Sequence, residues 1–457
     1  MGKEEMSRRD FIRRTSAAAG AAAAGKSILL DSEVAEAAPR PVPPSDTLRF
    51  GMIGIGMRGS SLLRTSIQLP GVRCVAACDL YDERHVLANS IISGETGETV
   101  PTTRRYQELL ENKDIDCIVA AVPDHWHMRV IVDACDAGKD IYCEKPMTHH
   151  VSEGFRIIDA ERKNNRILQI GSQRRSSIIF AKAKEIIDSG AAGDVRLVED
   201  TMGRNDPCGA WVYPYPPPPA LSPENLDWET WLGSAPKRPF DPRRYVSWRG
   251  YLDYGEGIPG DLYVHLLTGV HYIMGVTAPP ERAYSAGGLF QWKDGRDYPD
   301  QMSTLYEYPN FRLMIRVTLD NNSGEVIRFM GTRGTVEIRG HQVSFSPQDG
   351  KDQSLCYYAS SYPAKIHAEL SKAWEAKHPE VPGTARPLEA TSYQAPAGYN
   401  EGRQHLWNYF QSVRTRKPSV EDGTFGNNAS IACHMANDSY FKKTMAVWDG
   451  DSKTIRG

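Results

Sequence analysis

The sequence predicts an α/β protein with a parallel sheet in its N-terminal part and a mainly antiparallel sheet in its C-terminal part. From residue 47 to 171, apolar strand-like runs alternate with helix-like segments, which is typical of a parallel sheet covered on both faces. From about 281 to 346, apolar and polar residues alternate in short segments, which indicates antiparallel strands. The 457 residues are enough for two domains.

The expected elements of the N-terminal part follow a regular order. Strands are expected at 48–54, 72–78, 115–122, 140–143 and 167–170, and helices at 59–68, 82–93, 105–111, 126–137 and 152–164. In the C-terminal part we expect helices near 364–377 and at 402–414 and 426–443, with a hairpin turn at 331–334. Parallel strands end at one carboxyl edge, where open α/β sheets bind ligands.

The first strand runs into the glycine-rich turn Gly54-Ile55-Gly56-Met57-Arg58-Gly59, which has the spacing G-x-G-x-x-G. In a dinucleotide-binding Rossmann domain the first glycine makes the turn, the second admits the pyrophosphate and the third packs helix on strand. The helix that follows offers its N-terminal N–H groups to the phosphates. A glycine turn in some other α/β domain is the alternative.

Asp79 supports the dinucleotide interpretation. It ends the second strand, 20 residues after Gly59, where a carboxylate accepts hydrogen bonds from the ribose hydroxyls. Because a carboxylate repels a 2′-phosphate, the sequence favours NAD(H) over NADP(H). Arg84 lies close enough in sequence to weaken that preference.

The composition is ordinary for a globular protein and excludes two classes of partner. With 54 Lys and Arg against 57 Asp and Glu, the net charge of −3 gives no electrostatic reason to bind nucleic acid or an anionic membrane. Beyond the N-terminus no apolar run is long enough to span a bilayer. The eight cysteines include no C-x-x-C and no zinc-like spacing, so we expect no metal site. The sequence leaves open whether any two of these cysteines form a disulfide.

The N-terminus has the pattern of an export signal. Residues 7–13, Ser-Arg-Arg-Asp-Phe-Ile-Arg, form a twin-arginine pattern, and a stretch rich in Ala and Gly follows. We expect a signal peptide over 1–37, cleaved before Ala38, and a proline-rich linker over 38–46. The mature protein would then be periplasmic or otherwise extracytoplasmic, exported folded by the twin-arginine machinery. A disordered basic arm is the alternative.

Two stretches after apolar strands could carry chemistry. The first is Pro123-Asp124-His125-Trp126-His127 and the second is Glu144-Lys145-Pro146. The proline disfavours the helical region for Lys145, so we expect the lysine to be extended beside the ligand edge. A lysine there could assist deprotonation of a hydroxyl and stabilise the developing negative charge. A surface lysine at a strand end is the alternative.

The third stretch, 260–265, opens a long apolar run with Asp261 and His265. In a helix these residues are four apart and share a face, so the carboxylate could fix the tautomer of the imidazole and raise its basicity. A buried pair with a purely structural role is equally compatible. His271 lies about 120° further around the helix, so we assign it to the core or to a supporting shell rather than to a ligand set.

Residues 203–246 are rich in proline and aromatics, including Trp211, Tyr213 and Trp231. Aromatic faces pack on sugar rings, so this segment could line a carbohydrate site; an ordinary packed surface loop is an equal alternative.

With these motifs in place, the chain resembles the family of glucose–fructose oxidoreductase, inositol dehydrogenase and the rhizopine-catabolism protein (Gfo/Idh/MocA). The resemblance is carried in order by GIGMRG at 54–59, Asp79, VPDHWH at 122–127, AGKDIYCEKP at 137–146, GSQRR at 171–175 and GDLYVH at 260–265, and by RTRKPSVEDG near the end. Two positions depart from the family pattern: Thr268 stands where many members have Asp, and Tyr272 where Trp is usual.

The resemblance implies an NAD-binding Rossmann domain over 47–171, followed over 172–457 by an α+β domain for substrate binding and oligomerisation, with a large, mainly antiparallel open sheet. It implies a homodimer or homotetramer acting on a carbohydrate. The implied catalytic residues are Lys145, Asp261 and His265, with His265 as acid/base. The implied cofactor contacts are Gly54, Ile55, Gly56, Met57, Arg58, Gly59, Asp79, Pro123, His127, Glu144 and Lys145, and the implied substrate contacts are Lys145, Gln173, Arg174, Asp261 and His265.

These observations predict an exported NAD(P)-dependent oxidoreductase that transfers hydride between a sugar or cyclitol hydroxyl and nicotinamide. Internal redox cycling on tightly held NAD, an NAD-dependent glycosidase and a 3-keto-sugar enzyme are alternatives, and a non-catalytic NAD-binding sensor is a fourth. Retention of Lys145, Asp261 and His265 weakens the sensor interpretation.

Overall fold

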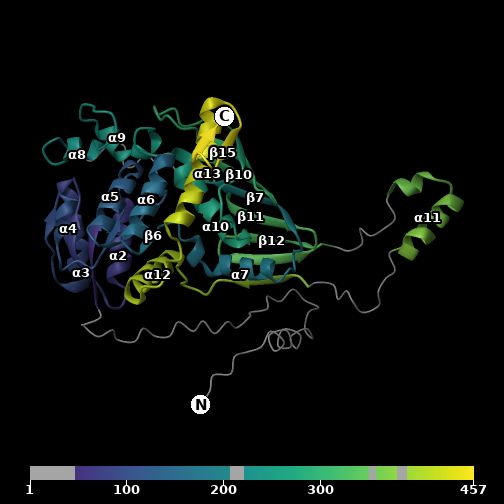
Figure 1. Ribbon diagram of the computed structural model, residues 1–457, viewed down its shortest axis with the longest axis horizontal. Coiled ribbons are helices and arrows are strands. Elements are labelled where there is room, and N and C mark those ends of the chain that lie inside the picture. Colours follow the sequence, from purple (N-terminus) through teal and green to yellow (C-terminus); the bar gives the residue numbers. More distant parts are fainter. Residues whose placement is uncertain (1–46, 206–220, 349–356, 378–388) are drawn as a thin grey trace, which may run out of the picture.

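The computed structural model describes residues 47–205, 221–348, 357–377 and 389–457. It consists of two parts side by side, an N-terminal α/β part and a C-terminal part built on a large sheet (Figure 1). The predicted export signal and linker lie in residues 1–46, outside the described residues.

The N-terminal sheet has six strands in the order β3-β2-β1-β4-β5-β6, all parallel where they pair. The order reverses between β1 (Leu48–Ile53) and β4 (Cys117–Ala120), which makes their carboxyl ends the switch point where such sheets bind ligands. The other strands are β2 (Val72–Cys78), β3 (Thr102–Thr103), β5 (Asp140–Cys143) and β6 (Leu168–Ile170). The doubly wound fold is confirmed, and the two-residue strand β3 was not predicted.

Helices cover both faces of this sheet. On one face, α2 (Met57–Ile67) and α3 (Asp82–Thr96) bury Leu62, Leu63 and Ile91 against Phe50 and its neighbours. On the other face, the covering helices are α4 (Tyr106–Glu111), α5 (Asp124–Asp136) and α6 (Val151–Lys163).

A helix from near the C-terminus helps to cover the same face of the sheet as α2 and α3. In α12 (Glu401–Thr415), Tyr409 and Phe410 are fully buried, and the Phe410 ring lies 5.8 Å from the ring of Phe50 on β1. The Tyr409 hydroxyl donates to the Ile118 carbonyl at 3.0 Å. Residues 401–415 therefore pack on the N-terminal sheet, although they lie within the C-terminal domain that the sequence predicts over 172–457.

The C-terminal sheet has ten strands in the order β14-β13-β12-β11-β7-β10-β9-β8-β15-β16. Its described pairs are antiparallel except β7 with β10, so the prediction of a large, mainly antiparallel sheet is confirmed. The strands are β7 (Val195–Gly203), β8 (Arg282–Gly288), β9 (Gln301–Glu307), β10 (Arg312–Thr318), β11 (Gly324–Gly331), β12 (Gly334–Arg339), β13 (Gln342–Pro347), β14 (Thr391–Gln394), β15 (Ala446–Asp449) and β16 (Thr454–Arg456). The turn between Gly331 and Gly334 is the predicted hairpin.

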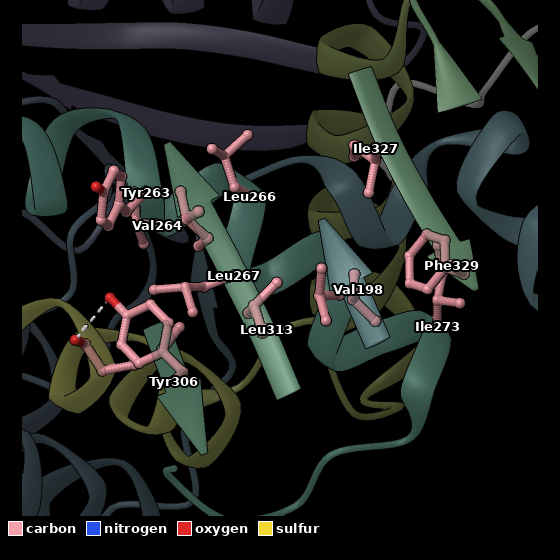
Figure 2. Packing of buried hydrophobic residues seen from close by; sticks show 14 of the residues in the cluster. Val198, Tyr263, Val264, Leu266, Leu267, Ile273, Tyr306, Leu313, Ile327 and Phe329 are labelled. Carbon is pink, nitrogen blue, oxygen red and sulfur yellow. Dashed lines mark hydrogen bonds between the residues drawn. The ribbon is translucent and has the colours of Figure 1, made fainter. Parts of the chain in front are cut away.

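One face of this sheet packs on helices and forms the largest core. Leu266 and Leu267 of α10 (Val264–Met274) lie against Leu313 of β10 and Tyr306 of β9 (Figure 2). The other helices of this layer are α7 (Ile178–Asp188) and α13 (Gly423–Lys442). Because α10 is buried almost all round, the side chains that precede it are held firmly at the edge of the N-terminal part.

A segment of the C-terminal part reaches back over the N-terminal part. It carries α8 (Trp228–Leu232) and α9 (Pro242–Val246), which lie beside α5 in Figure 1. The Trp126 indole donates to the Trp231 carbonyl at 2.9 Å, and the Trp228 and Trp231 rings stack 4.9 Å apart. The aromatics of 206–220, including Trp211 and Tyr213, lie outside the described residues.

The predicted helix near 364–377 is α11 (Ala364–Lys377), which Figure 1 shows away from both sheets. Among the described residues, no helix combines the length and apolarity needed to cross a membrane.

Candidate active site

The three glycines of the turn after β1 take three different environments. Gly54 has a φ of +81°, and a Cβ there would lie 2.4 Å from the Ala121 carbonyl oxygen. A Cβ on Gly59 would lie 1.9 Å from the Gly54 carbonyl oxygen, so α2 packs directly on the turn. At Gly56 a Cβ would meet nothing within 4 Å. The turn therefore leaves open space at its second glycine, where a phosphate group fits against the backbone.

Asp79 holds this turn to the end of β2. Its Oδ2 accepts the Ile55 N–H at 2.7 Å and its Oδ1 accepts the Tyr81 N–H at 3.0 Å. Burial raises the pKa of Asp79, and these two backbone hydrogen bonds oppose that shift. Each oxygen keeps a second lone pair, so the carboxylate can still accept from a ligand.

A cavity of about 660 Å³ runs from this turn to the start of α10. Eleven of the predicted site residues line it: Gly54, Gly56, Met57, Arg58, Asp79, Pro123, Glu144, Lys145, Gln173, Asp261 and His265. Aromatic side chains of the segment that carries α8 and α9 form another wall, with Trp231, Tyr245 and Trp248. Trp231 both lines the cavity and packs in a buried aromatic cluster. The volume falls within the range of cofactor sites.

Two predicted contacts need correction. His127 is fully buried, with Nδ1 2.5 Å from the Pro146 carbonyl oxygen and Nε2 2.9 Å from that of Val122. It joins the two loops behind the cavity and does not line it, so it is not a cofactor contact. The reason is its place on α5, whose inner face meets the sheet.

Arg174 also lies away from the cavity. It forms ion pairs with Glu325 at 2.7 Å and Glu401 at 3.3 Å, and its guanidinium lies 5.0 Å from the Phe180 ring centroid. It joins the ten-stranded sheet to α12 and is not a substrate contact. Ile55 and Gly59 act on the turn itself through the Asp79 hydrogen bond and the helix packing.

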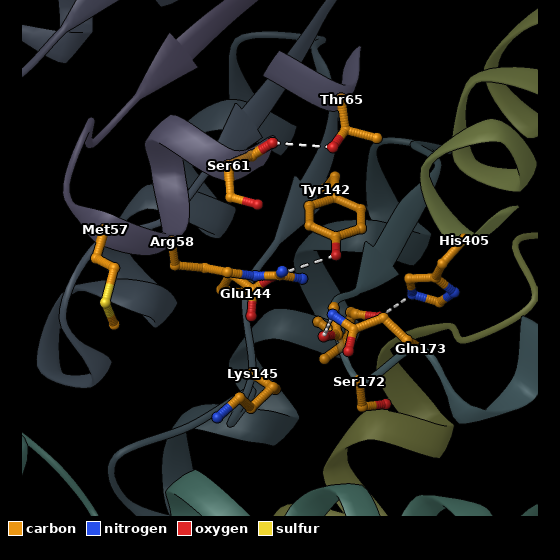
Figure 3. A network of polar contacts seen from close by, with 12 residues as sticks. Met57, Arg58, Ser61, Thr65, Tyr142, Glu144, Lys145, Ser172, Gln173 and His405 are labelled. Atoms are coloured by element: carbon orange, nitrogen blue, oxygen red, sulfur yellow. Dashed lines mark hydrogen bonds and ion pairs between the residues drawn. The ribbon is translucent and has the colours of Figure 1, made fainter. Parts of the chain in front are cut away.

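Arg58, which is half-buried, and the buried Glu144 form an ion pair between α2 and the end of β5. Arg58 Nε lies 2.8 Å from Glu144 Oε1, and the Tyr142 hydroxyl donates to the same oxygen at 3.2 Å (Figure 3). Glu144 is 5% exposed, so the arginine compensates a charge that water cannot reach freely. The pair ties the glycine turn to the strand that carries Lys145.

Lys145 reaches across to the turn before α10. Its ammonium donates to Asp261 Oδ1 at 2.7 Å and to the Asp261 carbonyl at 2.6 Å. The same carboxylate oxygen lies 3.4 Å from Nε of Arg249. These bonds fix the lysine side chain at the cavity wall and keep a cation there.

The partner of His265 differs from the expected one. Its Nδ1–H donates to the Ser172 carbonyl at 3.1 Å, so the carbonyl rather than Asp261 fixes the tautomer and leaves the Nε2 lone pair available. Asp261 lies in a π-helical turn, Pro259–Tyr263, where the four-residue spacing of an α-helix does not apply. Burial, followed by the charges of Lys145 and Arg174, holds the pKa of His265 well below its usual value.

A buried carboxyl supports the Ser172 segment. The Ser172 hydroxyl donates to Glu421, and the Ile170 N–H donates to the Glu421 carbonyl at 3.0 Å. Burial raises the pKa of Glu421 to about 8. Thr268, at one of the positions that depart from the family pattern, is buried and donates to the Val264 carbonyl at 2.8 Å.

Sequence reasoning missed Arg249, Trp248 and Glu421. Arg249 and Trp248 are adjacent in a single-turn 3₁₀ helix, Trp248–Gly250, that has no pattern of its own. Glu421 belongs to the motif RTRKPSVEDG, and nothing in that motif indicates its position beside Ser172. Among the described residues, no group of three His, Cys, Asp or Glu side chains is placed to hold a metal ion.

Two protein-family models match the chain. One, described as an oxidoreductase family with an NAD-binding Rossmann fold, matches residues 48–172. The other, described as the C-terminal alpha/beta domain of the same oxidoreductase family, matches residues 178–282. Together they cover half of the chain.

Among curated proteins, the chain is 35% identical over 154 residues to an inositol 2-dehydrogenase of Salmonella paratyphi B, a match covering 33% of this chain and 45% of that protein. It is 30% identical over 178 residues to a glycosyl hydrolase family 109 protein of Shewanella pealeana, covering 35% and 38%. The matches thus span less than half of these relatives' length. A levoglucosan dehydrogenase in complex with NADH and levoglucosan superimposes with a TM-score of 0.61 at 17% identity, covering 87% of this chain and 98% of that one, which shows a shared fold.

Proposed function

Because the chain belongs to the Gfo/Idh/MocA oxidoreductase family, we propose that it transfers a hydride between a sugar or cyclitol hydroxyl and a nicotinamide cofactor. One observation carries the proposal: Lys145 and His265 line the same cavity as the glycine turn. The inositol 2-dehydrogenase relative supports the substrate class.

The cavity fits a dinucleotide. The open space at Gly56 would take the pyrophosphate, next to the N-terminus of α2, and Asp79 would accept from the ribose. When bound, the nicotinamide ring supplies the acceptor for the hydride. We propose NAD(H) as the cofactor, because a carboxylate at position 79 repels a 2′-phosphate. Two arginines near Asp79 also line the cavity: Arg104 is already paired with Asp82 at 2.6 Å, whereas Arg84 is the residue that weakens this preference.

Two residues of the chain would accept the hydroxyl proton and stabilise the negative charge on the substrate oxygen. His265 Nε2 accepts the hydroxyl proton, since Nδ1 already donates to Ser172. The Lys145 ammonium, held by Asp261, donates to the substrate oxygen and stabilises the negative charge that develops on it. In the reverse direction His265 returns the proton.

The proposal extends to export and assembly. We propose that residues 1–37 direct export through the twin-arginine machinery, which would place the protein outside the cytoplasm. We also propose a homodimer or homotetramer formed through the open face of the ten-stranded sheet. On that face Leu197, Leu305 and Met314 are 37–41% exposed, and Met314 lies opposite Leu305, so these side chains form an apolar patch of the kind that marks protein interfaces.

The family 109 relative favours a second candidate, a glycosidase that oxidises a ring hydroxyl transiently on tightly held NAD. A panel of sugars and cyclitols, read by NADH absorbance with and without added NAD, separates the candidates. Turnover that requires added NAD supports the dehydrogenase. Release of nitrophenol from a nitrophenyl glycoside without net NADH supports the glycosidase, and NAD that survives desalting supports internal cycling, including a 3-keto-sugar enzyme. NAD binding without any turnover would support the non-catalytic NAD-binding sensor.

A further inference from the structure

The reaction end of the cavity carries two cations on one carboxylate. Lys145 Nζ lies 2.7 Å from Asp261 Oδ1, and Arg249 Nε lies 3.4 Å from the same oxygen. The lining also holds Glu144, which pairs with Arg58, and Asp124, which is 5% exposed and accepts the Glu256 N–H at 3.1 Å. Burial raises the pKa of Asp124 well above its usual value, and the charges of Arg249 and Lys145 oppose that shift. Two cations thus meet at a single carboxylate oxygen at this end of the cavity.

Arg249 is held in a fixed orientation. Its guanidinium lies 4.2 Å from the Trp248 ring centroid, and its side chain is 25% exposed. It pairs with Asp261, and the nearest atoms of that ion pair are Nε and Oδ1. Arg249 lines the cavity, and its guanidinium is a planar fork of donors, the geometry that binds a carboxylate or phosphate through two parallel hydrogen bonds.

Resting on the function proposed above, we propose that the carbohydrate substrate carries an anionic oxygen group, a carboxylate or a phosphate ester, which Arg249 binds beside Lys145 and His265. The cofactor's own phosphates are a poorer match for this arginine. Their expected place is at Gly56 and the N-terminus of α2, whereas Arg249 is joined through Asp261 to the reacting end. A neutral sugar could hydrogen-bond the guanidinium through its hydroxyls but would lack the opposite charge that makes such a contact strong.

The experiment measures binding separately from turnover. Full-length mature protein saturated with NADH is titrated by calorimetry with hexoses, with the matching uronic and aldonic acids and with the matching hexose 6-phosphates. We expect at least one acid to bind roughly 10- to 100-fold more tightly than its neutral counterpart, as for a charged, bidentate contact. Arg249→Gln should remove that advantage, and Arg249→Lys should recover part of it by restoring the charge without the fork. The uronic-acid and phosphate series tell the two anionic groups apart.

Arg244→Gln is the matched control. Arg244 lies 4.3 Å from the Tyr251 ring centroid and 3.2 Å from Asp253 Oδ2, but it does not line the cavity. Its replacement should leave the preference for acids intact. Equal affinity for acids and neutral sugars in the wild type would overturn the inference. So would an Arg249→Gln variant that loses NADH affinity while it keeps the acid preference. Arg249-dependent binding of an acid that is never oxidised would support this inference and contradict the oxidoreductase proposal.

Discussion

Replacing Gly56 with alanine tests whether the glycine turn holds the cofactor. Gly56 lies at the N-terminus of α2 with φ −68° and ψ −167°, a conformation open to any residue, and a Cβ there meets nothing within 4 Å. The added methyl group projects into open space next to the cavity, where we place the pyrophosphate. The protein should therefore fold normally and bind NAD poorly.

The expected change in stability is small because two effects oppose each other. Alanine is a poorer helix N-cap than glycine, which costs about 0.5 kcal/mol. Alanine also restricts the unfolded chain, which stabilises the fold by roughly 0.4–1 kcal/mol. The free energy of unfolding should stay within about 0.5 kcal/mol of the wild type.

The expected change in affinity is much larger. Moving the pyrophosphate away from the backbone loses at least one hydrogen bond to a charged oxygen, worth about 1.5–3 kcal/mol, so the NAD dissociation constant should rise roughly 10- to 150-fold. Quenching of tryptophan fluorescence on titration with NAD reports the affinity, since Trp231 and Trp248 line the cavity. Urea unfolding of the same samples reports the stability.

Gly94→Ala is the control for a glycine outside the site. Gly94 is an exposed residue inside α3, and a Cβ there also meets nothing within 4 Å. Alanine should stabilise the helix by about 1 kcal/mol and leave NAD affinity unchanged. If Gly56→Ala bound NAD as tightly as the wild type, the assignment of the turn to the cofactor phosphates would be refuted.

Three further predictions concern the catalytic pair, a buried acid and helix α12. His265→Asn and Lys145→Met should each lower kcat at least about 100-fold with little change in NAD affinity, and a variant with wild-type turnover would remove that residue from the mechanism. Glu421, whose pKa is raised to about 8 by burial, binds more protons in the folded than in the unfolded state, so its contribution to stability is full below pH 4.5 and is lost as the pH rises through about 8. Glu421→Gln should abolish that part of the pH dependence of the urea midpoint, and an unchanged profile would contradict the shift. Phe410→Ala should cost about 3–5 kcal/mol and lower NAD affinity with it, because Phe410 is fully buried against the strand that ends at the turn; loss of the C-terminal sheet alone would argue against that placement.

The sequence predicts those parts of the site that depend on local patterns of residues. The glycine spacing, the distance to Asp79 and the lysine after β5 are features of single turns beside parallel strands, whose carboxyl ends meet at one edge. Such positions follow from the order of strands, so the sequence alone predicts where Lys145 and Asp79 lie.

The parts that failed depend on packing between distant segments. Whether His127 faces the cavity depends on which side of α5 meets the sheet, and Arg174 turns toward carboxylates on β11 and α12 that no local pattern announces. The sequence also could not show that α12 returns to cover the first sheet, because its apolar spacing suits any buried surface. The sequence predicts Asp261 as the partner that fixes the tautomer of His265. In the structure the Ser172 carbonyl accepts from Nδ1 instead, because the turn before α10 is π-helical.

A crystal structure of the protein with NADH bound would test the central claim most directly. We expect the pyrophosphate over Gly56, the adenosine ribose at Asp79, and the nicotinamide ring at the end of the cavity that holds Lys145 and His265. A dinucleotide bound elsewhere, or one whose nicotinamide lies away from both side chains, would contradict the account.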